Sequence, residues 1–111
     1  MENTKAVKEA MQGAAFQMIA IAGTAKSEYL EAVTMAREGK FVEAFAKIEE
    51  GRTLMADAHH LHFEFITREA NEEDLPFSLI FMHAEDQLLT TEVIELMCTE
   101  NIRLYEALSK K

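Results

Sequence analysis

Glycine and proline are scarce in this sequence, which has four glycines and one proline among 111 residues. A chain of many short strands needs turn-forming residues at short intervals, whereas a few long helices need them only where the helices end. Hydrophobic residues make up 49% of the chain, which is enough to build a core and argues against disorder of its bulk. We therefore expect one all-α domain that occupies residues 1–111.

Apolar residues recur at helical spacing in the first third of the chain. Residues 1–12 show weak patterning, and we expect them to be a weakly ordered lead-in to the domain. After them, alternating steps of three and four residues predict an amphipathic helix, whose buried stripe is Ala15, Met18, Ala22, Ala25, Tyr29, Ala32 and Ala36. Gly39 fits the left-handed position that follows a helix end.

Two more helices are expected after this glycine. The second runs from about Lys40 to about Ala70, and its apolar side consists of Phe41, Ala44, Phe45, Ile48, Leu54, Met55, Ala58 and Leu61. Asp74 as an N-cap and Pro76 in the first turn predict the start of a third helix, which continues to about Leu108. With two tight connections, the three helices form an up-down-up antiparallel three-helix bundle.

The third predicted helix has two apolar faces. One face is sufficient for packing on the other two helices and consists of Phe77, Ile80, Phe81, Ala84 and Leu88. The other face has the alternating three- and four-residue spacing of a coiled-coil seam and consists of Leu79, Met82, Asp86, Leu89, Val93 and Leu96. A chain of 111 residues has too few helices to cover both faces, so we infer self-association through the third helix.

A carboxylate, Asp86, lies in the middle of this seam and would meet its own copies there. Because an unpaired buried charge is costly, three arrangements are open: protonation with a raised pKa, a cation shared between copies, or buried water. If a cation is shared, oxygen ligands and clustered negative charge favour a hard ion such as Mg²⁺ or Ca²⁺.

His83 and Asp86 are three residues apart, so both project near one side of the third helix. Gln87 follows His83 by one helical turn, and Thr90 follows Asp86 by one turn, which adds an amide and a hydroxyl to the patch. This spacing alone also fits a plain surface histidine beside a polar residue that fixes the register of a coiled coil.

The histidines His59, His60 and His62 invite a transition-metal hypothesis, but consecutive helical residues point about 100° apart and do not converge on one ion. Carboxylate-bridged di-metal bundles also need Glu-x-x-His segments, and the sequence has none. We favour the interpretation that one of these histidines faces His83 across the bundle as a hydrogen-bonding neighbour.

The charge of the chain excludes several kinds of partner. Eleven lysines and arginines stand against twenty aspartates and glutamates, for a net charge of -9, which argues against binding of nucleic acid or anionic lipid. No apolar run reaches the ~18 residues of a membrane span, so we expect no membrane insertion.

The single cysteine, Cys98, fits a reducing, cytoplasmic setting and packing as a small hydrophobe. Phosphate-binding loops and hydrolase motifs are missing, so any phosphoryl chemistry would have to be relayed from another protein.

The motifs of the chain resemble those of a known family. The segment Phe77-Ser78-Leu79-Ile80-Phe81-Met82-His83-Ala84-Glu85-Asp86-Gln87-Leu88-Leu89-Thr90-Thr91 is similar to the active-site helix of the lactose/cellobiose-type enzyme IIA proteins of the bacterial phosphoenolpyruvate-dependent sugar phosphotransferase system. Upstream segments also resemble this family, namely residues 19–27, 37–41, 56–59 and 68–70. The likeness covers roughly residues 14–108 in one register.

This resemblance implies a function and an assembly. Such proteins are three-helix subunits of a homotrimer that act as intermediate phosphocarriers of sugar uptake. They accept a phosphoryl group from the phosphocarrier protein HPr on a histidine, here His83, and pass it to a cysteine of enzyme IIB. The family's metal-binding aspartate on the trimer axis corresponds to Asp86, which implies a divalent cation there, with Mg²⁺ favoured. The sugar stays open among lactose, cellobiose, chitobiose and other β-glucosides, because the transporter subunit selects it.

Two positions depart from the family pattern. Family members commonly have a second histidine four residues after the phosphorylated one, where this chain has Gln87, and a usual glutamine on the second helix is replaced by His62. We expect both residues to support His83, with His62 taking over a contact of the missing histidine. The alternative is a helical oligomerisation or regulatory module that keeps the fold without phosphotransfer.

Overall fold

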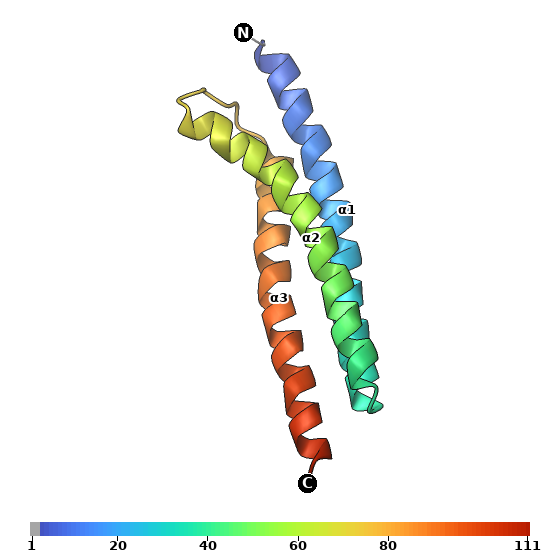
Figure 1. Ribbon diagram of the computed structural model, residues 1–111. Helices are drawn as coiled ribbons and strands as arrows, with labels where there is room; N and C mark the ends of the chain where they lie inside the picture. The colour runs from blue at the N-terminus through green and yellow to red at the C-terminus, as the bar shows by residue number, and fades with distance from the viewer. Residues whose placement is uncertain (1–2) are drawn as a thin grey trace.

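A computed structural model describes residues 3–111 of the protein, and these residues form three helices and no strand. The helices are α1 (Thr4–Arg37), α2 (Phe41–Ala70) and α3 (Leu79–Ser109). Consecutive helices are antiparallel, running down, up and down in the view of Figure 1, along a rod of 62 × 21 × 19 Å. The prediction of an all-α, up-down-up three-helix bundle is confirmed.

The core lies along α1, which packs against both other helices, whereas α2 and α3 contact each other far less. All seven residues of the predicted α1 stripe are buried, with at most 2% of their surface exposed. Five of them are alanines, and their small side chains let the backbones of α2 and α3 approach closely. Toward the end that carries the connection between α2 and α3, α2 swings away from α1 and passes over the start of α3 (Figure 1). The rings of Phe65 on α2 and Phe81 on α3 meet there with their centroids 5.3 Å apart.

The first turn agrees with the prediction. Gly39 has a φ of 84°, the left-handed conformation that a glycine adopts without strain. Its N–H donates to the carbonyl of Ala36 at 3.0 Å, and the N–H of Lys40 donates to that of Met35 at 2.9 Å. These bonds satisfy the last carbonyls of α1, so α2 can start at Phe41.

The prediction of a lead-in over residues 1–12 is wrong for the residues that the structure describes, while residues 1 and 2 lie outside them. Helix α1 already begins at Thr4, because the side-chain oxygen of Asn3 accepts a hydrogen bond of 2.7 Å from the N–H of Ala6. Val7 and Met11 are buried and extend the apolar stripe by two turns toward the N-terminus.

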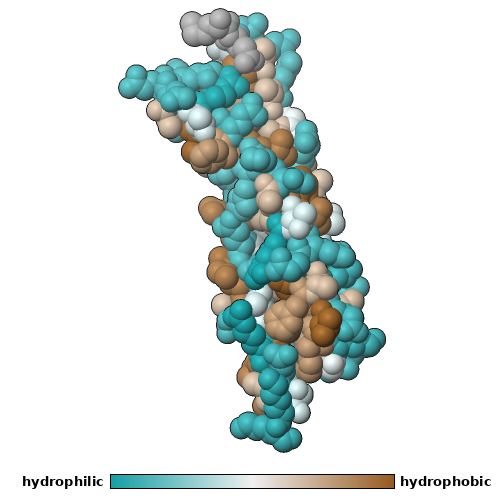
Figure 2. All heavy atoms as spheres, in the orientation of Figure 1, coloured by the Kyte–Doolittle hydropathy of each residue, from teal (hydrophilic) through white to brown (hydrophobic). Residues whose placement is uncertain are grey.

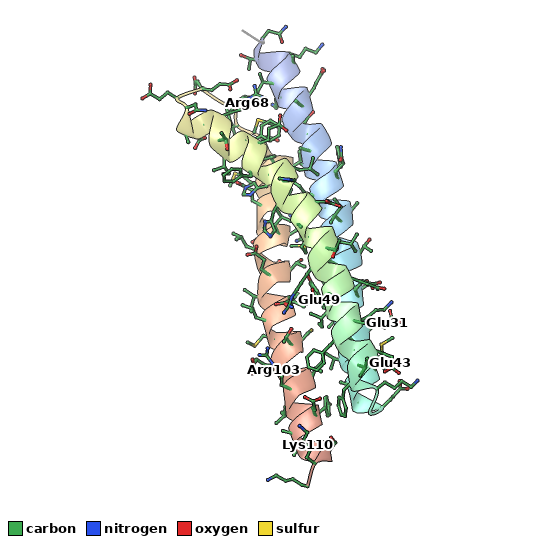
Figure 3. All side chains as sticks on the ribbon, viewed as in Figure 1. Glu31, Glu43, Glu49, Arg68, Arg103 and Lys110 are labelled. Atoms are coloured by element: carbon green, nitrogen blue, oxygen red, sulfur yellow. The ribbon has the colours of Figure 1, made fainter. Side chains whose placement is uncertain are left out.

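The second connection, residues 71–78, is longer than the predicted tight turn. Asp74 and Pro76 precede α3 instead of starting it, because Ser78 is the N-cap: its hydroxyl accepts a bond of 3.3 Å from the N–H of Phe81. Phe77 therefore lies outside the helix with 70% of its surface exposed, and its predicted place on the packing face is wrong. Arg68, labelled in Figure 3, ties the connection to α2 through two bonds to Glu73, of 2.8 and 2.6 Å.

Candidate functional site

His83 lies in the second turn of α3 and is exposed to solvent. The capping bond of Ser78 fixes where this helix begins and therefore the direction in which the His83 side chain projects. Within residues 3–111, the imidazole has no hydrogen-bond or ion-pair partner. An exposed imidazole with free ring nitrogens can attack an electrophile supplied by another molecule.

The surroundings of His83 form an open groove of about 650 Å³ between the starts of α1 and α3. The groove is lined by His83 together with Lys8, Gln12, Phe77, Ser78, Leu79 and Ile80. Two of these residues, Lys8 and Gln12, belong to the part of α1 that sequence reasoning took for a lead-in. A rigid helix therefore forms one wall of the groove beside the histidine.

Asp86 is exposed on the predicted seam of α3, one turn from His83. The five apolar residues of this seam face solvent with 52–71% of their surface exposed, and they are Leu79, Met82, Leu89, Val93 and Leu96. Hydrophobic side chains emerge along the edge formed by α3 in Figure 2. Such a row of exposed apolar side chains marks an interaction surface, so self-association through this face stays a prediction with a physical basis.

Gln87 is half-buried between α1 and α3 and is contacted by Lys26 of α1. The ammonium of Lys26 donates to Oε1 of Gln87 at 3.5 Å. Thr90, the other polar residue of the predicted patch, donates its hydroxyl to the backbone carbonyls of Asp86 and Gln87 at 2.9 and 3.3 Å. The proton of this hydroxyl is thus already used inside the helix.

The histidines of α2 contact glutamates of α3 and not His83. Nε2 of His62 lies 2.7 Å from Oε2 of Glu85, and Nε2 of His59 lies 2.6 Å from Oε1 of Glu92. His60 is exposed. The structure therefore does not place His62 against Gln87 or His83 within one chain. Its bond to Glu85 instead joins α2 to α3 beside the ring contact between Phe65 and Phe81.

A second groove, of about 490 Å³, lies between α2 and α3 and has Tyr29 at its base. Arg52 crosses it to Glu95, with Nε and Oε1 2.5 Å apart, and Thr99 donates to the same oxygen at 3.4 Å. Burial raises the pKa of Tyr29 to about 12, and the negative charge of Glu95 adds to this effect. Burial likewise raises the pKa of the Cys98 thiol, which packs in the core as expected.

Within residues 3–111, no three His, Cys, Asp or Glu side chains are arranged so that they could hold a metal ion together. A cation at Asp86 would therefore need ligands beyond the described side chains of one chain. None of the described helices combines the length and the apolar character needed to cross a membrane.

Sequence reasoning missed three contacts at this site: Lys26 with Gln87, Glu85 with His62 and Glu92 with His59. The position of Lys26 beside the buried Ala25 was an available signal, since a long side chain there can reach a neighbouring helix. Its partner on α3 depends on how α1 and α3 are aligned, which periodicity alone does not determine.

Comparison with known proteins identifies the family. A model of the family described as "PTS system, Lactose/Cellobiose specific IIA subunit" matches residues 13–106. The chain belongs to this family. It therefore has the phosphocarrier role in sugar uptake of a phosphotransferase-system IIA component.

Individual members are similar over nearly their whole length. The lactose-specific EIIA component of Staphylococcus aureus (strain N315) is 35% identical over 99 residues, which cover 89% of this chain and 96% of that protein. The crystal structure of the cellobiose-specific enzyme IIA from Bacillus anthracis superposes with a TM-score of 0.86 at 31% identity, over 100% of this chain and 96% of the other. The chitobiose IIA of Escherichia coli, solved in complex with HPr, gives a TM-score of 0.79 at 28% identity, over 89% of this chain and 96% of the other.

Proposed function

We propose that the chain accepts a phosphoryl group from phosphorylated HPr on His83 and passes it to a cysteine of enzyme IIB. The observation that carries this proposal is the exposed, unpartnered imidazole of His83, at the edge of an exposed apolar face, in a member of the IIA family. The similar chitobiose IIA, solved with HPr, supports HPr as the donor.

The two transfer steps need only the imidazole of His83, the phosphorylated histidine of the donor and the cysteine of enzyme IIB. In the first step, the lone pair of a neutral ring nitrogen of His83 attacks phosphorus, a new P–N bond forms and the P–N bond of the donor histidine breaks. The proton on the other ring nitrogen of His83 is released and the donor histidine takes up one proton, so the donor leaves as a neutral imidazole and no net proton is consumed. In the second step the cysteine thiol of enzyme IIB gives up its proton and attacks as a thiolate, a P–S bond forms and the P–N bond to His83 breaks. His83 takes up one proton and leaves as a neutral imidazole, so the proton count balances. Such transfers depend on in-line positioning and on donors for the phosphoryl oxygens.

We further propose that the chain acts as a homotrimer in which copies of Asp86 share a divalent cation, Mg²⁺ being favoured. The support is local: Asp86 is exposed without a cationic partner in residues 3–111, among apolar side chains that self-association would cover. A carboxylate is a suitable ligand for a hard cation, and the cation would offset the repulsion between the copies. In this assembly, His83 would lie next to a subunit boundary.

Phosphorylation by the purified system tests the first proposal. The protein is incubated with phosphoenolpyruvate, enzyme I and HPr, and acid-labile phosphate is measured in wild type and in His83→Gln. We expect label in wild type and none in the variant. An unlabelled wild type would favour the alternative of a helical module without phosphotransfer, and label that persists in His83→Gln would rule out this histidine.

Replacement of the seam carboxylate tests the second proposal. Asp86→Leu should remain trimeric by sedimentation, because it replaces clustered charge with apolar contact, and it should lose the bound ion in metal analysis. Dissociation into monomers would instead show that the ion contributes more to the assembly than the apolar seam does.

A further inference from the structure

The contact between Lys26 and Gln87 fixes which end of the Gln87 amide faces α1. An ammonium group has only donors, so the atom that it contacts at 3.5 Å must be the carbonyl oxygen Oε1. Both side chains are half-buried, which limits their freedom to rotate. The NH₂ end of Gln87 consequently points away from Lys26, and it has no acceptor among residues 3–111.

Gln87 lies one helical turn after His83, and residues at this spacing have Cβ atoms about 5–6 Å apart. Helical side chains tilt toward the helix N-terminus, so the side chain of Gln87 leans toward the turn that carries His83. Thr90 does not compete for this role because its hydroxyl donates to the helix backbone. The Gln87 amide is therefore an uncommitted donor beside the proposed phosphorylation site.

An amide donates at one end and accepts at the other. A phosphoryl group on an imidazole carries negative charge on three oxygens, so the NH₂ end of Gln87 stabilises it and the oxygen end repels it. A free amide would present either end. An anchored amide presents only the donor, and this anchoring removes the cost of orienting it during transfer.

We propose that Lys26 is a positioning residue for phosphoryl transfer: it holds Oε1 of Gln87 so that the Gln87 NH₂ group donates to an oxygen of the phosphoryl group on His83. This inference rests on the proposed function of His83. It assigns Lys26 no contact with the phosphoryl group and gives Gln87 a defined role at the position where the family commonly has a second histidine.

The test is the single-turnover rate of transfer from phosphorylated HPr to Lys26→Met, Gln87→Leu and the double variant. Lys26→Met keeps the length and helix propensity of the side chain and removes its charge. Lys5→Met is the matched control, because it removes the same charge from an exposed position of the same helix. Lys26→Arg keeps a donor and should restore the rate.

We expect Gln87→Leu to slow transfer by roughly 100-fold, the effect of losing one preorganised donor. Lys26→Met should slow it by roughly tenfold through misorientation of the amide. The maximal single-turnover rate should fall, whereas the concentration of phosphorylated HPr that gives half of that rate should be unchanged. In the Gln87→Leu background, Lys26→Met should have no further effect, because it acts only through the amide.

Three results would contradict these expectations in distinguishable ways. A wild type that carries no phosphate on His83 contradicts the proposed function itself. A phosphorylated wild type with Lys26→Met as fast as Lys5→Met overturns the role of Lys26 alone. A tenfold loss that persists in the Gln87→Leu background shows that Lys26 acts independently of Gln87 and overturns the positioning role.

Discussion

The two faces of α3 have similar hydrophobicity and opposite environments. On the face toward α1, Phe81, Ala84 and Leu88 have at most 6% of their surface exposed. On the other face, side chains of the same kind, such as Leu89 and Val93, are 61% and 58% exposed. Polar residues separate the two faces at the level of His83 and Gln87.

This difference shows how one helix can serve the fold and the proposed function at once. The buried face holds α3 on α1 and sets the direction of each side chain. The exposed face carries Asp86 among apolar residues, and His83 lies at the border between the faces, beside α1. A group at such a border is held rigidly by the bundle and still accessible to a partner protein.

Two adjacent leucines allow the sharpest test of this comparison. Leu88→Ala removes a side chain that is 1% exposed and should lower the free energy of unfolding by about 2–5 kcal/mol at every protein concentration. Leu89→Ala, at 61% exposure, should weaken self-association and change unfolding only through its concentration dependence. Urea unfolding at several concentrations measures both. Equal losses in the two variants at low concentration would show that the faces are not distinct.

A buried glycine on α2 and an exposed glycine on α1 allow the same comparison of buried and exposed positions on the other two helices. A Cβ added at Gly51 would lie 2.3 Å from Cε1 of the buried Tyr29, so Gly51→Ala should destabilise the protein by about 1–3 kcal/mol. A Cβ at Gly23 meets no atom within 4 Å, so Gly23→Ala should stabilise by up to about 1 kcal/mol through helix propensity. Thermal unfolding of the two variants measures whether each substitution raises or lowers the stability. A stabilising Gly51→Ala would contradict the close packing of Tyr29 against Gly51.

The pH dependence of the free energy of unfolding tests the burial of Tyr29 in the core of the bundle. The pKa of Tyr29 is raised from 10.0 to about 12, so the folded state favours the neutral phenol. This contribution is fully present below pH 10 and should be lost as the pH rises toward 12. Tyr29→Phe should reduce the loss of stability at alkaline pH, measured by urea unfolding. Tyr105→Phe, which changes a half-buried tyrosine near the C-terminal end of α3, should still show the full alkaline loss. Identical profiles for wild type and Tyr29→Phe would contradict the assignment.

Periodicity predicted the parts of the fold that follow from local burial. The α1 stripe, the left-handed Gly39 and the exposed seam of α3 are each visible as spacing or as a turn residue, and the structure confirms them. The helix starts were predicted less well. Asn3 and Ser78 are both good caps, but a cap is recognised only once the following turn is known to be helical, and Asp74 and Pro76 offered an equally plausible start for α3.

The sequence singled out the residues of the candidate site but could not predict their contacts. His83, Asp86 and Gln87 stand out as polar residues on an apolar helix, and the resemblance to the family singled them out again. The partners of His62 and Gln87 depend on the axial positions of α1, α2 and α3 relative to one another, which arise from the packing of the whole bundle. A sequence pattern specifies the face of a helix, whereas a side-chain contact also needs the register between two helices.

Localisation of the phosphate tests the central claim most directly. The chain has four histidines, of which His59 and His62 are paired with glutamates of α3. His60 lines a groove between α2 and α1, together with Gln17 and Ile21. After phosphorylation by phosphoenolpyruvate, enzyme I and HPr, peptide mapping by mass spectrometry at neutral to alkaline pH should place the phosphate on the peptide that contains His83 and on no other. Phosphate on the peptide that contains His59, His60 and His62 would contradict the account.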